Sequence, residues 1–132
     1  MIIADTNLIA YLMIPSPKTL LAKNVYLKDS EWRSSLLWRS EFRNVLMLYI
    51  RNREISLYKA TQMMEMAEKK LGMGLSPSSD DVLALAEQSG CTAYDCEFVA
   101  LAMTLKVPLL TSDRKVLAAF PDVATSPEEY LV

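Results

Sequence analysis

Short apolar runs along the chain alternate with longer stretches in which apolar residues recur every three or four positions. The run Met1–Ala4 predicts a buried first strand, and the runs Trp32–Trp38 and Val107–Thr111 predict a second and a third. The tail, Val123–Val132, predicts a small strand and a last helical turn that begins at Ser126. The strands are therefore short and widely separated in sequence.

Between the strands the spacing changes to that of amphipathic helices. Phe42, Val45, Leu46 and Tyr49, for example, lie three, one and three residues apart and so share one helix face. Proline, glycine and serine mark the ends of these stretches. We expect helices starting near Thr6 or Asn7, over 20–27, from Ser40 to Asn52, over Ser56–Leu71, from the turn at 76–81 to Gly90, across 98–105, and through Ala119.

This alternation of strands and helices predicts an α/β protein. We expect a three-layer α/β/α sandwich in which helices cover both faces of a mainly parallel central sheet. The sequence contains no internal repeat, low-complexity tract or long linker. The prediction is therefore one domain that spans residues 1–132.

Histidine is absent from the 132 residues, of which 52% are hydrophobic and 23% charged. A Ser-His-Asp hydrolase, a Cys-His protease, a histidine-ligated zinc site and a zinc deaminase all need an imidazole. These classes are excluded. Any acid–base or metal chemistry must therefore use carboxylates.

Other scarce residues exclude further classes. With only three glycines, no segment forms a dinucleotide fingerprint or a Walker loop. Two cysteines, Cys91 and Cys96, cannot make a four-thiolate zinc site, and so few favour a reduced, cytoplasmic protein. The opening MIIADTN has no basic segment and soon reaches Asp5, so we expect neither a signal peptide nor a membrane span.

Four acidic residues lie where predicted strands and helices meet. Asp5 ends the first strand, Glu41 begins the helix after the second, Asp95 begins the helix that contains Phe98, and Asp113 follows the third strand. In a parallel α/β sheet the ligand crevice lies at the carboxyl ends of the strands, so these acids can converge there. Glu97 lies about 200° around a helix from Asp95, which places it beside the site.

A group of four carboxylates repels itself unless a cation is present, and its natural occupant is a hard divalent ion such as Mg²⁺ or Mn²⁺. Such an ion activates water and orients a phosphodiester. Helix capping is the alternative for Asp5, Asp95 and Asp113, and interaction with the helix dipole is the alternative for Glu41.

Several polar residues close to the acids are candidates for supporting roles. Asn7, Thr111 and Ser112 can donate hydrogen bonds to the carboxylates, or can simply satisfy turns. Without the four acids the chain has 14 positive and 12 negative charges, which leaves +2. Candidate contacts to the phosphates of a phosphodiester substrate, with solvated helix ends as the alternative, are Arg39, Arg43, Arg114 and Lys115.

Four segments of the sequence resemble those of the PIN-domain family, especially its VapC-type toxins from bacterial and archaeal toxin–antitoxin modules. They are IIADTN at Asp5, WRSEFRNVL at Glu41, YDCEFVALA at Asp95 and PLLTSDRKVL at Asp113. The segments occur in the family's order and at its usual spacing, and the resemblance covers nearly the whole chain.

The resemblance implies a metal-dependent endoribonuclease that cleaves single-stranded or structured RNA. Asp5, Glu41, Asp95 and Asp113 would form an acidic tetrad that holds one or two Mg²⁺ or Mn²⁺ ions, and a metal-activated water would attack the scissile phosphate. The resemblance also implies a homodimer and a small VapB-type antitoxin that blocks the site.

Three alternatives remain open from the sequence. The first is a PIN-like RNA-processing nuclease outside a toxin–antitoxin module, and the second is a catalytically silent PIN-like module that binds a partner. The third is a signalling receiver domain, whose pattern fits badly. A receiver needs adjacent acids after the first strand and a lysine after a late strand, whereas Asp5 precedes Thr6 and Asn7 and Lys106 precedes its strand.

Overall fold

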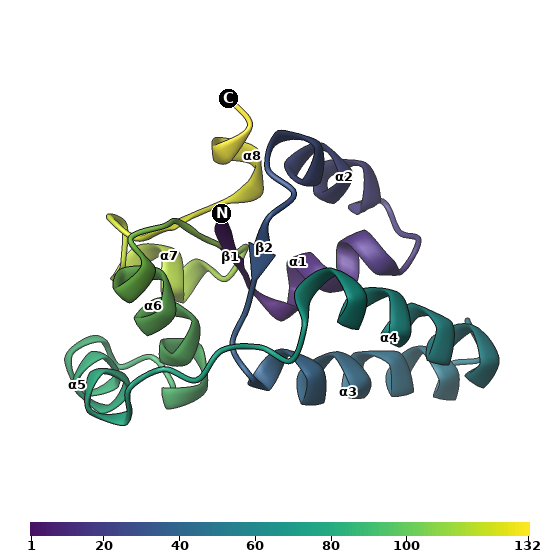
Figure 1. The fold of residues 1–132 in the computed structure, drawn as a ribbon, viewed down its shortest axis with the longest axis horizontal. Helices are drawn as coiled ribbons and strands as arrows, with labels where there is room; N and C mark the ends of the chain where they lie inside the picture. Colours follow the sequence, from purple (N-terminus) through teal and green to yellow (C-terminus); the bar gives the residue numbers. More distant parts are fainter.

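The computed structural model describes residues 1–132 as eight helices and four short strands (Figure 1). The first half of the chain contains β1 (Ile2–Ala4), α1 (Thr6–Met13), α2 (Thr19–Lys28), β2 (Trp32–Arg33), α3 (Leu37–Arg51) and α4 (Leu57–Leu71). The second half contains α5 (Ser79–Ser89), α6 (Ala93–Leu105), β3 (Leu109–Leu110), α7 (Arg114–Ala119), β4 (Ala124–Thr125) and α8 (Pro127–Tyr130).

The four strands form one fully parallel sheet in the order β2-β1-β3-β4. After β1 the chain crosses to β2 on one side, and later returns to β3 on the other side of β1. The β1–β3 pair is therefore the point at which the strand order reverses, where open α/β sheets bind ligands. Ala4 lies opposite Leu110 in this pair, so both strands end side by side.

Helices cover both faces of the sheet, because side chains alternate along each strand. Ile2, Ala4 and Leu110 pack into a core with α1 to α4, whereas Ile3 and Leu109 pack into a second core with α5 to α7. Figure 1 shows these two groups of helices on opposite sides of β1 and β2. The predicted three-layer sandwich with a parallel sheet is confirmed.

The second strand is shorter than the sequence predicts. We expected a strand over Trp32–Trp38 and a helix from Ser40, but β2 ends at Arg33 and α3 already begins at Leu37. Trp38 is fully buried, as in a strand, but it packs from the first turn of the helix against Phe42. An apolar run beside a helix start does not by itself distinguish the two structures.

The backbone after β2 is fixed by a close approach from a distant segment. Leu75 and Ser35 form an isolated parallel bridge, and neighbouring Gly74 lies directly against the main chain. A Cβ atom at Gly74 would come within 2.8 Å of the Leu36 backbone, and its φ of +97° also favours glycine. The connection from α4 to α5 is thereby anchored at the start of α3.

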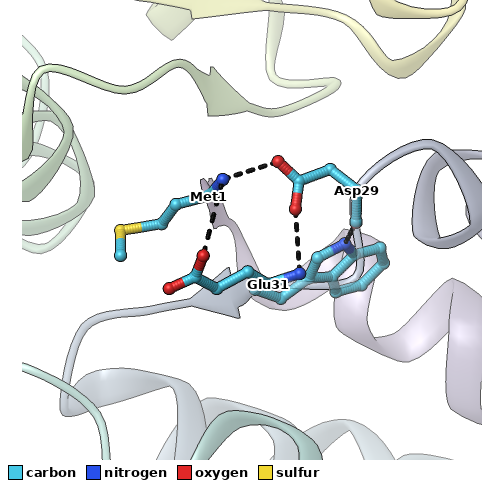
Figure 2. Close-up of polar contacts among 4 residues, drawn as sticks. Met1, Asp29 and Glu31 are labelled. Atoms are coloured by element: carbon cyan, nitrogen blue, oxygen red, sulfur yellow. Dashed lines mark hydrogen bonds and ion pairs between the residues drawn. The ribbon is translucent and has the colours of Figure 1, made fainter.

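At the amino end of β1 the charges are paired. The Met1 ammonium donates a hydrogen bond of 2.6 Å to Asp29 Oδ2 and lies 3.9 Å from Glu31 Oε2 (Figure 2). The ammonium holds the pKa of Asp29 below its ordinary value, since its hydrogen bond favours the ionised carboxylate. This end of the strand is therefore electrostatically satisfied.

Two further findings concern the cysteines and the apolar character of the helices. Both cysteines, Cys91 and Cys96, are free and buried in the core on the α6 side of the sheet. None of the helices combines the length and the apolar composition that a membrane span requires.

Candidate functional site

A pocket of about 290 Å³ opens at the carboxyl end of the β1–β3 pair. All four predicted acids line it, although they come from four separate parts of the chain. The polar lining is completed by two threonines and two asparagines. These eight residues are Asp5, Glu41, Asp95, Asp113, Thr6, Thr111, Asn7 and Asn44.

Asp5 lies at the centre of this arrangement, directly after β1. Its Oδ1 caps α1 by accepting a hydrogen bond of 2.8 Å from the Leu8 amide, and its Oδ2 accepts one of 2.6 Å from the Thr111 hydroxyl. Burial raises the pKa of Asp5 to about 6; the two hydrogen bonds oppose this rise, and the charges of Asp113 and Glu41 add to it. Protein surrounds this carboxylate, and no lysine or arginine forms an ion pair with it.

Asp113 reaches the same pocket from the loop after β3. Its Oδ1 caps α7 by accepting hydrogen bonds from the amides of Lys115 and Val116, while its Oδ2 has no hydrogen-bond partner. The Asp113 amide donates to the Thr111 hydroxyl, which in turn donates to Asp5. Thr111 thus connects two of the acids, which agrees with its predicted supporting role.

Glu41 faces the pocket from the second turn of α3. Its Oε1 accepts a hydrogen bond of 2.6 Å from the hydroxyl of Thr6, and its Oε2 has no partner. Thr6 is buried, with 7% of its surface exposed, in the first turn of α1. This hydrogen bond joins two helices across the opening of the site.

Asp95 differs from the other acids because neither of its carboxylate oxygens has a hydrogen-bond partner. Thr92 caps α6 by accepting from the Asp95 amide, so the Asp95 side chain is free of the capping role. The capping alternative is thus correct for Asp5 and Asp113 but not for Asp95. Asp5 and Asp113 cap a helix and line the pocket at the same time, because each carboxylate uses only one of its two oxygens to accept from the helix amides.

Glu97 lies outside the pocket, as its spacing from Asp95 predicts. It accepts a hydrogen bond of 2.8 Å from the Ser35 hydroxyl, which also accepts from the Leu37 amide. Glu97 thereby connects α6 to the start of α3. Glu97 thus lies on the same helix as Asp95, but its carboxylate binds Ser35 and does not line the pocket.

Asn7 lines the pocket as well, but Ser112 and the four predicted phosphate contacts do not. Ser112 is exposed, as are Arg43, Arg114 and Lys115. Arg39 forms an ion pair with Glu68, at 3.0 Å between Nη2 and Oε2, and so connects α3 to α4. Contacts of these residues with RNA remain a prediction.

Two polar pocket residues, Thr6 and Asn44, are absent from the sequence-based assignment. Asn44 lies three positions after Glu41, and this helical spacing could have placed both on one face of α3. The hydrogen bond from Thr6 to Glu41 has no sequence signal, because it joins residues 35 positions apart.

The donor atoms of the pocket fit a hard divalent cation. They are carboxylate, hydroxyl and amide oxygens, which Mg²⁺ and Mn²⁺ prefer. In this structure no three acidic or cysteine side chains are grouped so that they could hold a metal ion by themselves. A bound cation would offset the negative charges of Asp5, Asp113 and Glu41.

The fold and pocket define a class of α/β protein with a parallel sheet and acids at its strand-order reversal. No protein-family model matches the chain. It is 28% identical over 128 residues to Ribonuclease VapC3 of Pyrobaculum aerophilum, covering 94% of this chain and 98% of that protein.

Solved structures share the fold. PAE2754 from Pyrobaculum aerophilum matches with a TM-score of 0.79 and 20% identity, covering 98% of this chain and 91% of that one. A toxin–antitoxin complex from Klebsiella pneumoniae has a TM-score of 0.71 and 18% identity, with coverage of 96% and 98%. FitAcB from Neisseria gonorrhoeae has a TM-score of 0.68 and 19% identity, with coverage of 97% and 99%.

These similarities each cover 94% or more of the chain. The predicted resemblance to PIN-domain proteins of the VapC type is therefore confirmed.

Proposed function

We propose that this protein is a metal-dependent endoribonuclease and the toxin of a VapBC-type pair. The observation that carries the proposal is the convergence of Asp5, Glu41, Asp95 and Asp113 in one pocket. The similarity to Ribonuclease VapC3 along nearly the whole chain supports the activity. The shared fold with a toxin–antitoxin complex supports the toxin role.

In this proposal the four acids hold Mg²⁺ or Mn²⁺. Asp95 contributes an unengaged carboxylate, and Glu41 and Asp113 each contribute an oxygen that has no protein partner. Asp5 contributes the most buried charge. When bound, the divalent cation neutralises charge at the phosphodiester and makes water a stronger nucleophile at neutral pH.

The chain's own groups place the substrate and the acids. Thr111 orients Asp5 and Asp113, and the amides of Asn7 and Asn44 supply neutral donors in a pocket that is otherwise acidic. The exposed cations Arg43, Arg114 and Lys115 hold the RNA backbone next to the pocket. Because they contact phosphates, they position the RNA without selecting its sequence.

The proposal extends to the assembly. Residues 1–132 act as one PIN-like domain, which is supported by the pairing of β1, near the start, with β3, near the end. A small VapB-type antitoxin covers the pocket and inhibits the enzyme, and two copies form a homodimer. The two free cysteines are consistent with action in the reducing cytoplasm.

The test is cleavage of single-stranded RNA by the purified protein with MnCl₂ or with EDTA. Asp95→Asn is the informative variant, because its carboxylate makes no hydrogen bond whose loss would unfold the protein. Glu97→Gln, on the same helix but outside the pocket, is the matched control.

We expect Mn²⁺-dependent cleavage by the parent and by Glu97→Gln, and loss of cleavage in Asp95→Asn. Equal cleavage by all three would contradict the assigned site. A parent that cleaves RNA but does not arrest growth when expressed would point to an RNA-processing nuclease instead of a toxin. A parent that neither binds Mn²⁺ nor cleaves RNA would indicate a silent binding module.

A further inference from the structure

The contact between Thr6 and Glu41 has a role that helix formation does not explain. Thr6 occupies the first turn of α1, but the helix is already capped by Asp5, which accepts from the Leu8 amide. The Thr6 hydroxyl instead donates across the pocket to Glu41 Oε1, 2.6 Å away. Its hydrogen-bonding capacity is therefore directed at an acid and not at its own backbone.

Glu41 depends on this contact for its orientation. The Thr6 hydroxyl is its one hydrogen-bond donor, and no lysine or arginine forms an ion pair with it. A glutamate side chain loses rotamer entropy when it is fixed. A donor that fixes it before the cation arrives removes that cost from binding.

The burial of Thr6 makes the hydroxyl a rigid donor. The residue is 7% exposed and β-branched, so its χ1 angle is restricted by its own backbone and by its packing. Glu41 is partly exposed on α3 and would otherwise be free to turn toward solvent. The fixed partner thus determines where the mobile partner points.

Thr111 provides an internal comparison. It also lines the pocket and donates to Asp5 Oδ2 at the same distance, 2.6 Å. Asp5 also accepts from a backbone amide, so it retains one hydrogen bond if the threonine is lost. Glu41 retains none. Removal of the Thr6 hydroxyl therefore releases its acid more completely.

We propose that Thr6 is a positioning residue that holds Glu41 Oε1 so that the carboxylate faces the acidic pocket, and that tight binding of a divalent cation there requires this hydroxyl. The inference rests on the proposed function. It adds a specific residue of α1 to a site whose cation ligands are carboxylates.

The experiment is a calorimetric titration of the purified protein with MnCl₂. Thr6→Val keeps the shape of the side chain but removes the donor, and Thr6→Ser restores the donor. Thr61→Val is the matched control, because its hydroxyl is exposed on α4 and bonds only to the Leu57 carbonyl. We expect Thr6→Val to weaken Mn²⁺ binding by about 10- to 100-fold, as loss of a residue that orients a metal ligand does.

We expect Thr6→Ser and Thr61→Val to bind Mn²⁺ like the parent. A second measurement separates positioning from a general loss of structure. In RNA cleavage, Thr6→Val should raise the Mn²⁺ concentration needed for half-maximal rate while the KM for RNA stays unchanged. In a Glu41→Gln background, Thr6→Val should have no further effect on Mn²⁺ affinity, since the two residues act through one contact.

Each outcome decides the inference. Equal Mn²⁺ affinity of Thr6→Val and the parent overturns it and leaves the proposed function intact. Equal weakening by Thr6→Ser and Thr6→Val also overturns it, because the hydroxyl would then not be the cause. A parent that binds no Mn²⁺ and cleaves no RNA overturns the proposed function and this inference together. If Thr6→Val does not fold, the same comparison is made with Thr6→Ala.

Discussion

The two ends of β1 are separated by a strand of only three residues and have opposite electrostatics. At the amino end, Asp29 and Glu31 face the Met1 ammonium, and the pKa of Asp29 lies below its ordinary value (Figure 2). At the carboxyl end, Asp5 faces Asp113 and Glu41, and its pKa is raised to about 6.

The charges at the amino end of β1 stabilise the fold, whereas the acids at the carboxyl end can stabilise a bound ligand. Paired charges at the amino end need nothing further. Burial of the Asp5 carboxylate, together with the charges of Asp113 and Glu41, lowers the stability of the folded protein, and a perturbed group in a pocket is typical of a functional site. Two threonine hydroxyls fix these acids without neutralising them.

The largest expected effect comes from removing the charge of Asp5 at the carboxyl end of β1. We expect Asp5→Asn to lower Mn²⁺-dependent RNA cleavage at least about a hundredfold, because each loss of about 1.4 kcal/mol of transition-state stabilisation costs a factor of ten. Cleavage rates at saturating RNA measure this. Asp29→Asn, at the other end of the strand, is the control and should cleave within about twofold of the parent. Similar losses in both variants would refute the distinction.

The same Asp5→Asn change should stabilise the protein in EDTA. The folded-state pKa of about 6 lies above the ordinary 3.8, so the charged carboxylate lowers stability as the pH rises through this range. The gain should be absent near pH 4, grow up to pH 6, and reach at most about 3 kcal/mol above it. The asparagine oxygen still caps Leu8.

Urea unfolding of parent and variant at pH 4 and pH 8 measures this gain. An Asp5→Asn protein that is less stable than the parent at pH 8 in EDTA would mean that other contacts already compensate for burial of the charged Asp5 carboxylate. The asparagine would then have cost the protein a net favourable interaction.

The smallest effect is expected at the amino end. Asp29→Asn removes a partly exposed ion pair and should destabilise the protein by no more than about 1 kcal/mol at pH 7 and low salt. Because the folded-state pKa is lowered, this contribution is present above pH 3.8 and is lost as the pH falls through the folded-state value. Added salt should shrink the difference between parent and variant, and a salt-independent difference would contradict a screened pair.

Much of the architecture follows from local patterns in the sequence. Helical spacing predicts α3 and α4, and the strand-like runs place β1 and β3 correctly. The predicted second strand is longer than β2, which ends at Arg33. Ser34 and Ser35 are fully buried because they donate hydrogen bonds to Ala4 and Glu97, not because they lie in a strand. Polar residues satisfied by distant partners cannot be distinguished in advance from polar residues that end a strand.

The sequence predicts which acidic residues make up the site, but it does not predict how these residues contact others. The absence of histidine and the acids at element junctions predict which four carboxylates line the pocket. The Thr6 contact with Glu41 and the pairing of Arg39 with Glu68 depend on how helices pack. Such contacts join residues about thirty positions apart, beyond the reach of any local pattern.

The most direct test of the central claim, that the four acids form one cation site, is a calorimetric titration with MnCl₂ of the parent, Asp95→Asn and Glu97→Gln. These two acids are neighbours on α6, but only Asp95 lines the pocket. The account predicts that the parent and Glu97→Gln bind Mn²⁺ equally and that Asp95→Asn binds at least about tenfold more weakly, or about 1.4 kcal/mol. Equal binding by all three proteins, or no binding by the parent, would contradict it.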